Sequence, residues 1–158
     1  MDDNREKVIL ESFRQAELFS QAQMSIALAA DGRAMTFCGL CIAAASLLLG
    51  LDGSDEIKVG MYAASAVLYA AAAIAGWRGL PVDWYAPGQK GGDFAEDVAT
   101  GRPYIDVISE MITQSDRHLS QNSQRLAKSG WWLRMSAYLA VSAPLVGAAV
   151  QVIVWIWF

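Results

Sequence analysis

The sequence predicts an all-α, polytopic membrane protein with three transmembrane helices and two long cytoplasmic amphipathic helices. Residues 34–51 and 59–77 form apolar runs of eighteen and nineteen residues without a charge. Helices of that length reach roughly 27–29 Å, close to a hydrocarbon core of about 30 Å. Backbone in lipid must form its hydrogen bonds internally, so each run is expected to be helical. A pair of buried helices in a soluble protein is the alternative, and a third apolar run near the C-terminus argues against it.

Length and composition indicate one unit that is partly in the membrane and partly in water. The chain has 158 residues, of which 54% are hydrophobic and 18% charged. It divides into residues 1–33, an amphipathic helix; 34–77, a transmembrane hairpin; 78–130, a loop and a second amphipathic helix; and 131–158, the third span. The net charge of −4 argues against nucleic acid as a partner. The first 33 residues are polar, so no secretory signal peptide is expected.

The first segment reads as an amphipathic helix that leads into the first span. Apolar residues recur at steps of three or four, namely Ile9, Phe13, Ala16, Phe19, Ala22, Ile26 and Ala30. Asp31, Gly32 and Arg33 then mark the expected membrane surface.

Small residues in the hairpin predict close packing of its two helices. Gly39 and Ala43 lie four apart in the first span, followed by Ala44 and Ala45, and Gly60 and Ala64 repeat the spacing in the second. Small side chains let helix backbones approach closely in lipid. An alanine-rich sequence without a specific seam is the alternative. The loop at 52–58 is short enough to be only a turn.

The segment 78–130 begins at an interfacial anchor, Trp77 and Arg78. Prolines and glycines at 79–88 exclude a helix there, and Trp84 and Tyr85 are expected at the lipid headgroups. A short helix at 94–99 and a long helix from Pro103 follow. The long helix has an apolar stripe that thins between residues 115 and 128, composed of Tyr104, Val107, Ile108, Met111, Ile112, Leu119 and Leu126.

The third span follows Gly130, Trp131 and Trp132 and is apolar apart from Arg134. Pro144 predicts a kink, because proline removes one backbone donor and clashes with the preceding turn. An aromatic belt is expected at the far end, at Trp155, Trp157 and Phe158. Gln151 is the one strong polar group deep in this span, and either a bond across helices or an interfacial position would explain it.

Each amphipathic helix has an apolar stripe that needs a partner, and the economical partner is the other helix. Both run toward the membrane, so equal distances from it set the register. This places Phe13 near Met111 or Ile112, Ile9 near Val107 or Ile108, and Phe19 near Ser115 or Leu119. The alternative is a first helix that lies flat on the membrane.

Basic residues predict the orientation in the membrane. Eleven of the twelve Lys and Arg residues lie in 1–33 and 78–134, and only Lys58 lies in the hairpin loop. The side rich in Lys and Arg is expected to be cytoplasmic. The location predicted is therefore a bacterial inner membrane, with the N-terminus cytoplasmic and the C-terminus periplasmic.

No catalytic constellation is recognisable, so the chain is not expected to be an enzyme or to hold a cofactor or metal. His118 is the only histidine and reads as a solvated helix residue. Cys38 and Cys41 have CxxC spacing but lie in an apolar span, so they read as small packing residues, with lipidation or metal binding as the alternative. Residues 88–92 lack the spacing of a phosphate-binding loop. An acidic cluster could bind a cation or basic partner, although carboxylates complementing helix dipoles explain it as well; it comprises Asp93, Glu96, Asp97, Asp106 and Glu110.

The order of elements resembles the small transmembrane effectors of bacterial cyclic-pyrimidine (Pycsar) anti-phage systems. The matching stretches are residues 11–51, 59–77, the Tyr85-Ala86-Pro87-Gly88 turn, and 107–139. The resemblance implies that a cyclic nucleotide such as cyclic UMP or cyclic CMP binds the cytoplasmic part and that the membrane is then permeabilised. It is a resemblance of order and pattern and assigns no ligand residue.

The expected function is therefore an inner-membrane effector that oligomerises and perturbs the bilayer on a cytoplasmic signal. Its partners would be the lipid bilayer, further copies of the chain and a cyclic nucleotide. The alternative is an accessory or scaffold subunit of a larger membrane complex, with other membrane proteins as partners. A membrane enzyme or small transporter is a weaker reading, because the spans lack the charged or metal-binding side chains that it would need.

Overall fold

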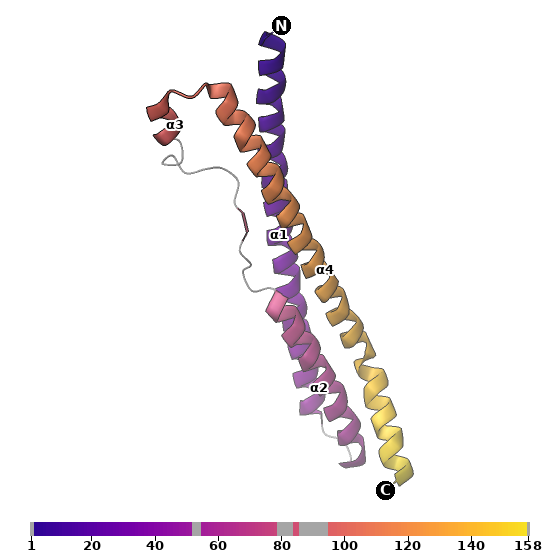
Figure 1. The fold of residues 1–158 in the computed structure, drawn as a ribbon. Coiled ribbons are helices and arrows are strands. Elements are labelled where there is room, and N and C mark those ends of the chain that lie inside the picture. The colour runs from indigo at the N-terminus through magenta and orange to yellow at the C-terminus, as the bar shows by residue number, and fades with distance from the viewer. Residues whose placement is uncertain (1, 52–54, 79–83, 86–94, 158) are drawn as a thin grey trace. The chain divides into compact units, whose positions relative to one another are not determined.

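The computed structural model describes residues 2–51, 55–78, 84–85 and 95–157, and these are almost entirely helical (Figure 1). The helices are α1 (Asp2–Gly50), α2 (Asp55–Arg78), α3 (Ala95–Thr100) and α4 (Tyr104–Trp157). No strand occurs among these residues, which confirms the all-α class. Three helices, α1, α2 and α4, are long and apolar enough to cross a membrane. The expectations for the loops at 52–54 and 86–92, for Asp93 and for Phe158 lie outside the described residues.

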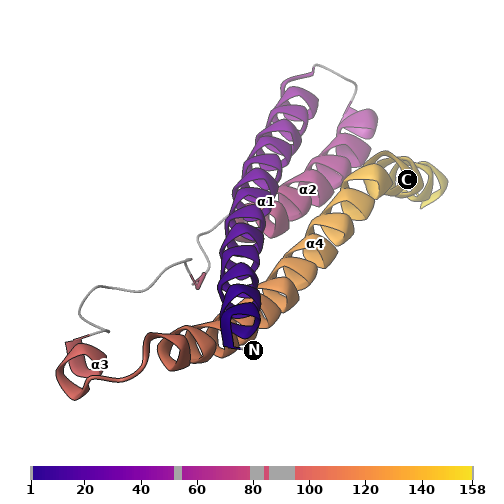
Figure 2. The ribbon, with the colours of Figure 1, turned by 90° about the horizontal axis from the view of Figure 1, so that it is seen from above.

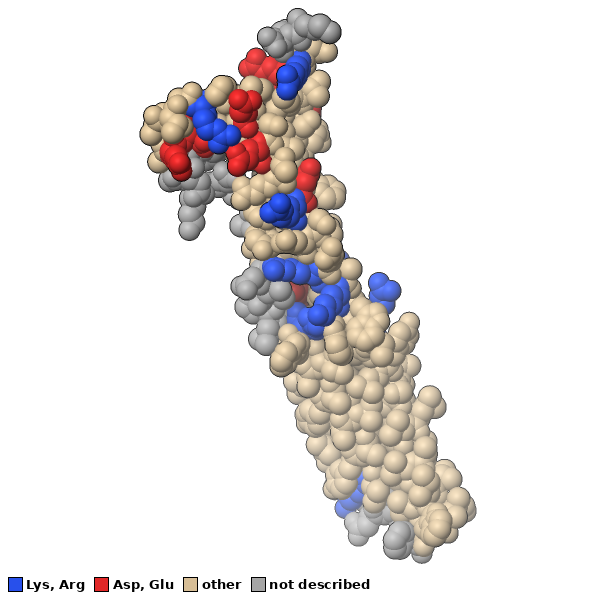
Figure 3. All heavy atoms as spheres, viewed as in Figure 1, with Lys and Arg blue, Asp and Glu red and all other residues tan. Residues whose placement is uncertain are grey.

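The chain forms two compact units. Unit 1 comprises Met1–Leu28 and Val82–Leu126, and unit 2 comprises Ala29–Pro81 and Ala127–Phe158. Charged side chains gather on unit 1, whereas the visible face of unit 2 is mainly uncharged (Figure 3). The short helix predicted at 94–99 is present as α3, and the long helix after Pro103 begins at Tyr104.

In unit 1 the N-terminal part of α1 packs against the first part of α4 (Figure 1). The Gln23 amide of α1 donates hydrogen bonds to the Leu119 carbonyl at 3.2 Å and to Ser123 Oγ at 2.7 Å. Phe19 and Leu119 line the same groove, as the predicted register requires. The pairing of the two helices is confirmed, while the closer contacts expected for Phe13 and Ile9 stay predictions.

The buried face of α1 differs from the predicted stripe. Phe19 and Ile26 are 58% and 55% exposed, whereas Gln23 is only 6% exposed. Three residues advance an α-helix by about 300°, so the successive steps of three from Phe13 to Phe19 and Ala22 turn the stripe off the contact face. The observed face alternates steps of four and three, the spacing of paired helices, along residues 9, 13, 16, 20, 23 and 27.

Unit 2 brings together segments of α1, α2 and α4 (Figure 2). Small side chains form the contacts between them. Its central cluster is Cys41 of α1 with Ala71 and Ala72 of α2. Two serine hydroxyls reinforce the contacts: Ser65 donates to the Ala45 carbonyl at 3.2 Å and Ser136 to the Ala71 carbonyl at 2.7 Å. Close packing through small residues is confirmed for Ala45, Gly60 and Ala64, but not for every residue of the predicted seam.

The tightest approach in unit 2 joins two glycines of α2 and α4. A Cβ placed on Gly60 would lie 2.7 Å from the Gly147 carbonyl oxygen, and one on Gly147 would lie 2.8 Å from the Gly60 oxygen. The Gly60 N–H also donates to Gln151 Oε1 at 3.2 Å. Gln151 therefore bonds across helices, which is one of its two predicted roles.

Gly39 was predicted to lie in the seam between the helices, and this prediction is wrong. Among the described residues, apart from its own helix turn, nothing lies within 4 Å of a Cβ placed on Gly39, and Ala43 and Ala44 are exposed as well. The face of α1 that packs in unit 2 instead carries Ala34, Cys41 and Ala45. Pro144 lies inside α4, and the helix continues through it without a break.

Candidate functional site

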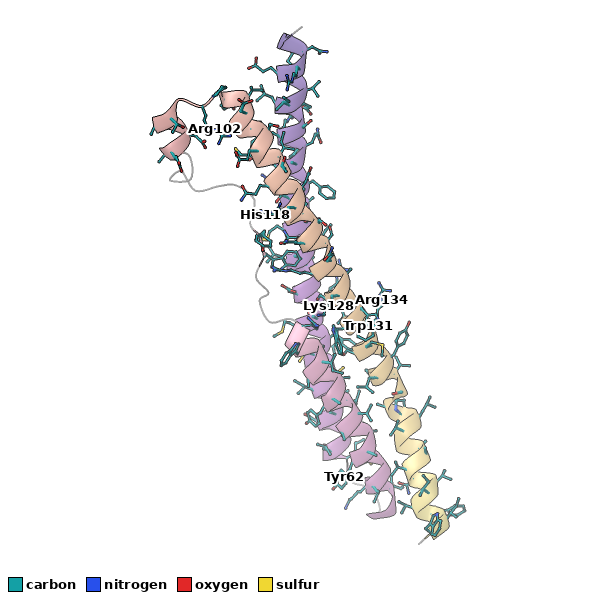
Figure 4. The ribbon with its side chains drawn as sticks, viewed as in Figure 1. Tyr62, Arg102, His118, Lys128, Trp131 and Arg134 are labelled. Atoms are coloured by element: carbon teal, nitrogen blue, oxygen red, sulfur yellow. The ribbon has the colours of Figure 1, made fainter. Side chains whose placement is uncertain are left out.

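The most organised polar cluster of unit 1 lies where residues 84–85 meet α4. We call it the Tyr85 site; it consists of Tyr85, His118, Asn122 and Arg125. The three α4 positions follow one another by four and three residues, so they share one face of the helix. Figure 4 shows His118 on α4.

Tyr85 is fixed by both its ring and its backbone. Its ring stacks on His118 with centroids 4.2 Å apart and planes 6° apart. Asn122 accepts from the Tyr85 N–H at 3.3 Å and donates to the Tyr85 carbonyl at 3.1 Å. Asn122 is only 3% exposed, so its amide must be satisfied locally, and Tyr85 supplies both partners.

Arg125 brings a charge to the same ring. Its guanidinium carbon lies 5.1 Å from the centroid of Tyr85, within the range of a cation–π contact. Its Nη1 is buried without a hydrogen-bond partner among the described residues, as is Oε1 of Gln23. An unpaired buried donor is costly, so a ligand acceptor at this nitrogen would be stabilising.

The sequence did not indicate this arrangement. His118 was expected in water, but it is partly buried and its ring stacks on Tyr85. The position expected for Tyr85 at the lipid headgroups stays a prediction. The sequence does show that residues 118, 122 and 125 share a polar face of α4. No local sequence pattern, however, indicates that residues 84–85 pack on that face. The residue that does so is separated from Asn122 by 37 positions.

A second charged cluster joins α3 to α4. Arg102 Nη1 lies 2.8 Å from Asp97 Oδ1 and Nη2 lies 3.0 Å from Glu110 Oε2. The hydrogen bonds with Glu110 and then Asp97 raise the pKa of Arg102, so it stays charged. Gly101, with φ of +65°, makes the turn between the helices.

The ion pairs of Arg102 explain part of the acidic cluster that the sequence showed. Asp97 and Glu110 are paired with Arg102, while Glu96 and Asp106 lie in the first turns of α3 and α4, where carboxylates complement the dipole. Within the described ranges, no group of three or more His, Cys, Asp or Glu residues could hold a metal ion.

A groove with apolar walls lies along the helix pair of unit 1. It has a volume of about 1020 Å³. Val8, Leu18 and Phe19 line it, and each is about half exposed or more. Ile112 and Leu119 of α4 form the facing wall. We call it the α1–α4 groove.

The two cysteines behave as packing residues. Both thiols are free, with Cys41 buried in the core cluster of unit 2. The Sγ of Cys38 lies 3.3 Å from a Cβ placed on Gly76, so Cys38 packs against α2.

No protein-family model, curated protein or solved structure matches this chain.

Proposed function

We propose that the chain is a bacterial inner-membrane effector that oligomerises and perturbs the bilayer when unit 1 receives a soluble signal. The signal we propose is a cyclic nucleotide in anti-phage defence, in line with the resemblance in element order. In this proposal unit 1 and the N-terminus are cytoplasmic and the C-terminus is periplasmic, because eleven of twelve basic residues lie in the segments on one side.

The observation that carries the proposal is the continuity of α1 and α4. α1 has 49 residues and α4 has 54, and each contributes to both units. The junctions at Leu28–Ala29 and Leu126–Ala127 are helical, so backbone hydrogen bonds cross them. A conformational change in the helix pair of unit 1 would therefore be transmitted to the apolar segments along continuous helices and not across a flexible linker.

The Tyr85 site supports a nucleotide as the signal. A planar base can stack on His118 in place of Tyr85, because every base offers a π-face to an aromatic ring. The free Nη1 of Arg125 suits a phosphate oxygen, since charge-assisted bonds from guanidinium to phosphate are strong. Exchange of Tyr85 for a base would release residues 84–85 from Asn122.

The test is membrane leakage on induced expression, followed with a potential-sensitive dye with and without cyclic UMP or cyclic CMP. Depolarisation that depends on the nucleotide supports the proposal. Tyr85→Leu should change the nucleotide dependence, whereas the matched variant Tyr104→Leu, at an exposed tyrosine at the start of α4, should not. No depolarisation in either state would refute it.

A second pair of variants tests the coupling. Ala29→Pro removes a backbone bond at the junction in α1 and costs about 3 kcal/mol or more in a helix interior. Asn4→Pro lies in the first turn, where the N–H is unpaired in any case. The proposal expects Ala29→Pro to bind nucleotide but not leak, and Asn4→Pro to resemble wild type.

The alternative function is an accessory or scaffold subunit of a larger membrane complex. The α1–α4 groove favours it, because exposed apolar side chains outside the spans call for a partner. A pull-down in a gentle detergent separates the two. A stoichiometric unrelated protein supports the scaffold, and a pure homo-oligomer supports the effector.

A further inference from the structure

A second cavity lies in unit 2, at the C-terminal end of α2. Its volume is about 520 Å³, within the usual range for small-molecule sites. Four of its residues come from the last two turns of α2, and two come from α4. We call it the Arg78 cavity; its lining is Ala73, Ile74, Trp77, Arg78, Lys128 and Trp132.

The cavity has two cations, Arg78 and Lys128, that no carboxylate of the described residues neutralises. Among the described residues, neither Arg78 nor Lys128 has an acidic partner within 4.0 Å. The Nε of Arg78 is buried and has no hydrogen-bond partner in the part of the chain that the structure describes. The C-terminal end of a helix carries partial negative charge and does not itself attract an anion. The attraction of this cavity for an anion therefore comes from the side chains of Arg78 and Lys128.

The position of Arg78 is fixed by an aromatic ring. Its guanidinium carbon lies 5.3 Å from the centroid of Trp132, a cation–π contact. Trp132 in turn meets Trp131 edge to face, with centroids 4.8 Å apart. The guanidinium is therefore preorganised before any ligand arrives, which lowers the entropic cost of binding.

The remaining walls of the cavity are apolar and belong to helices that could cross a membrane. Ala73 and Ile74 belong to a helix apolar enough to cross a bilayer, and Trp77 is 72% exposed at its end. Tryptophan at such a position lies at the level of the lipid headgroups. One side of the cavity thus suits a phosphate and the other suits the start of an acyl chain.

We propose that the Arg78 cavity binds an anionic phospholipid, with its phosphate held by Arg78 and Lys128 and its chain against Ala73 and Ile74. Basic pockets between transmembrane helices are the kind of site that anionic headgroups occupy. The inference goes beyond the proposed function, because it depends only on membrane insertion and not on any soluble signal.

The experiment uses the full-length protein in nanodiscs of phosphatidylcholine alone or mixed with phosphatidylglycerol. Retained lipid is counted by native mass spectrometry, and affinity is measured by titration with a fluorescent phosphatidylglycerol. Wild type should retain phosphatidylglycerol in preference to phosphatidylcholine. Arg78→Gln and Lys128→Gln should each weaken binding about fivefold, the factor that corresponds to about 1 kcal/mol for one basic group at a membrane surface.

Arg134→Gln is the matched control. Arg134 is exposed on the same helix, does not line the cavity, and projects away from α2 (Figure 4). Its loss should leave the affinity unchanged. An equal loss with Arg134→Gln would show diffuse surface charge and overturn the proposal, as would equal retention of the two lipids by wild type.

Inorganic phosphate separates the two sources of the anion. A lipid site also uses the apolar wall, so inorganic phosphate should not displace phosphatidylglycerol; displacement would make this a site for a soluble anion and overturn the proposal. If Arg78→Gln fails to fold, Lys128→Gln decides, since Lys128 is an exposed residue.

Discussion

The glycine contact between α2 and α4 predicts that the same chemical change affects stability differently at two positions. We expect Gly60→Ala to destabilise the protein and Gly39→Ala not to destabilise it. Gly60→Ala adds one Cβ, which would lie 2.7 Å from the Gly147 carbonyl oxygen and 3.0 Å from Gln151 Oε1. Ordinary contact begins near 3.4 Å, and the closer neighbour is backbone, so the helices must move apart by several tenths of an ångström. Gly39→Ala adds the same group at a position where, beyond its own helix turn, no described residue lies within 4 Å.

The magnitude follows from three contributions. Overpacking of this kind costs about 1–3 kcal/mol. Weakening of the bond from Gly60 to Gln151 adds about 0.6 kcal/mol, the mean for such bonds between membrane helices. Alanine in place of glycine regains up to about 1 kcal/mol within a helix. With the full alanine gain subtracted, these contributions leave Gly60→Ala destabilised by about 0.6–2.6 kcal/mol, whereas Gly39→Ala is expected to be neutral or stabilising by up to about 1 kcal/mol.

The assay is unfolding of the reconstituted protein by a denaturing detergent, followed by the tryptophan fluorescence of the spans. The two variants are compared at the same lipid-to-protein ratio. Equal stability of Gly60→Ala and Gly39→Ala would refute the reasoning, because it would mean that the glycines of α2 and α4 do not meet. Gly147→Ala tests the same contact from the other side and should resemble Gly60→Ala.

Three further predictions concern other parts of the chain. A reporter fused after Phe158 should be periplasmic and one inserted at Gly91 cytoplasmic; cytoplasmic activity of the first fusion would contradict the proposed orientation. Asn122→Ala should free Tyr85 at a cost of about 1–3 kcal/mol, because two part-buried hydrogen bonds to the Tyr85 backbone are lost, and hydrogen exchange at the Tyr85 amide should accelerate while that of α3 stays unchanged. Gln151→Leu should lower stability by about 0.6–1.7 kcal/mol in the same unfolding assay, and a gain instead would argue that the cross-helix bond is not formed.

The burial of α1 shows why the pairing of helices could be predicted better than their contact faces. Two apolar stripes outside the spans require a partner, and Gln23 with Ser123 confirms that the helices meet. Which face of α1 is buried depends on rotation of the helix about its axis by a few tens of degrees. The spacing of apolar residues between Phe13 and Phe19 does not determine that rotation. The structure accordingly buries Gln23 and exposes Phe19.

The Tyr85 site illustrates the limit for function. His118, Asn122 and Arg125 could be recognised as a polar face of one helix from their spacing. What covers that face is a residue far away in the chain, held by two hydrogen bonds to Asn122. Such a contact leaves no periodic trace in the sequence around either partner.

The sequence by itself determined the three apolar helices, the presence of α3 and, to within one residue, the start of α4. These features depend on local properties, namely the length of an uncharged run, the backbone's need for internal hydrogen bonds in lipid, and turns at Gly101 and Pro103. Only the tertiary structure decided that Gly60 rather than Gly39 meets a neighbouring backbone. Both glycines allow close approach, and which of them is used depends on where the partner helix lies, a property that no single helix carries in its own sequence.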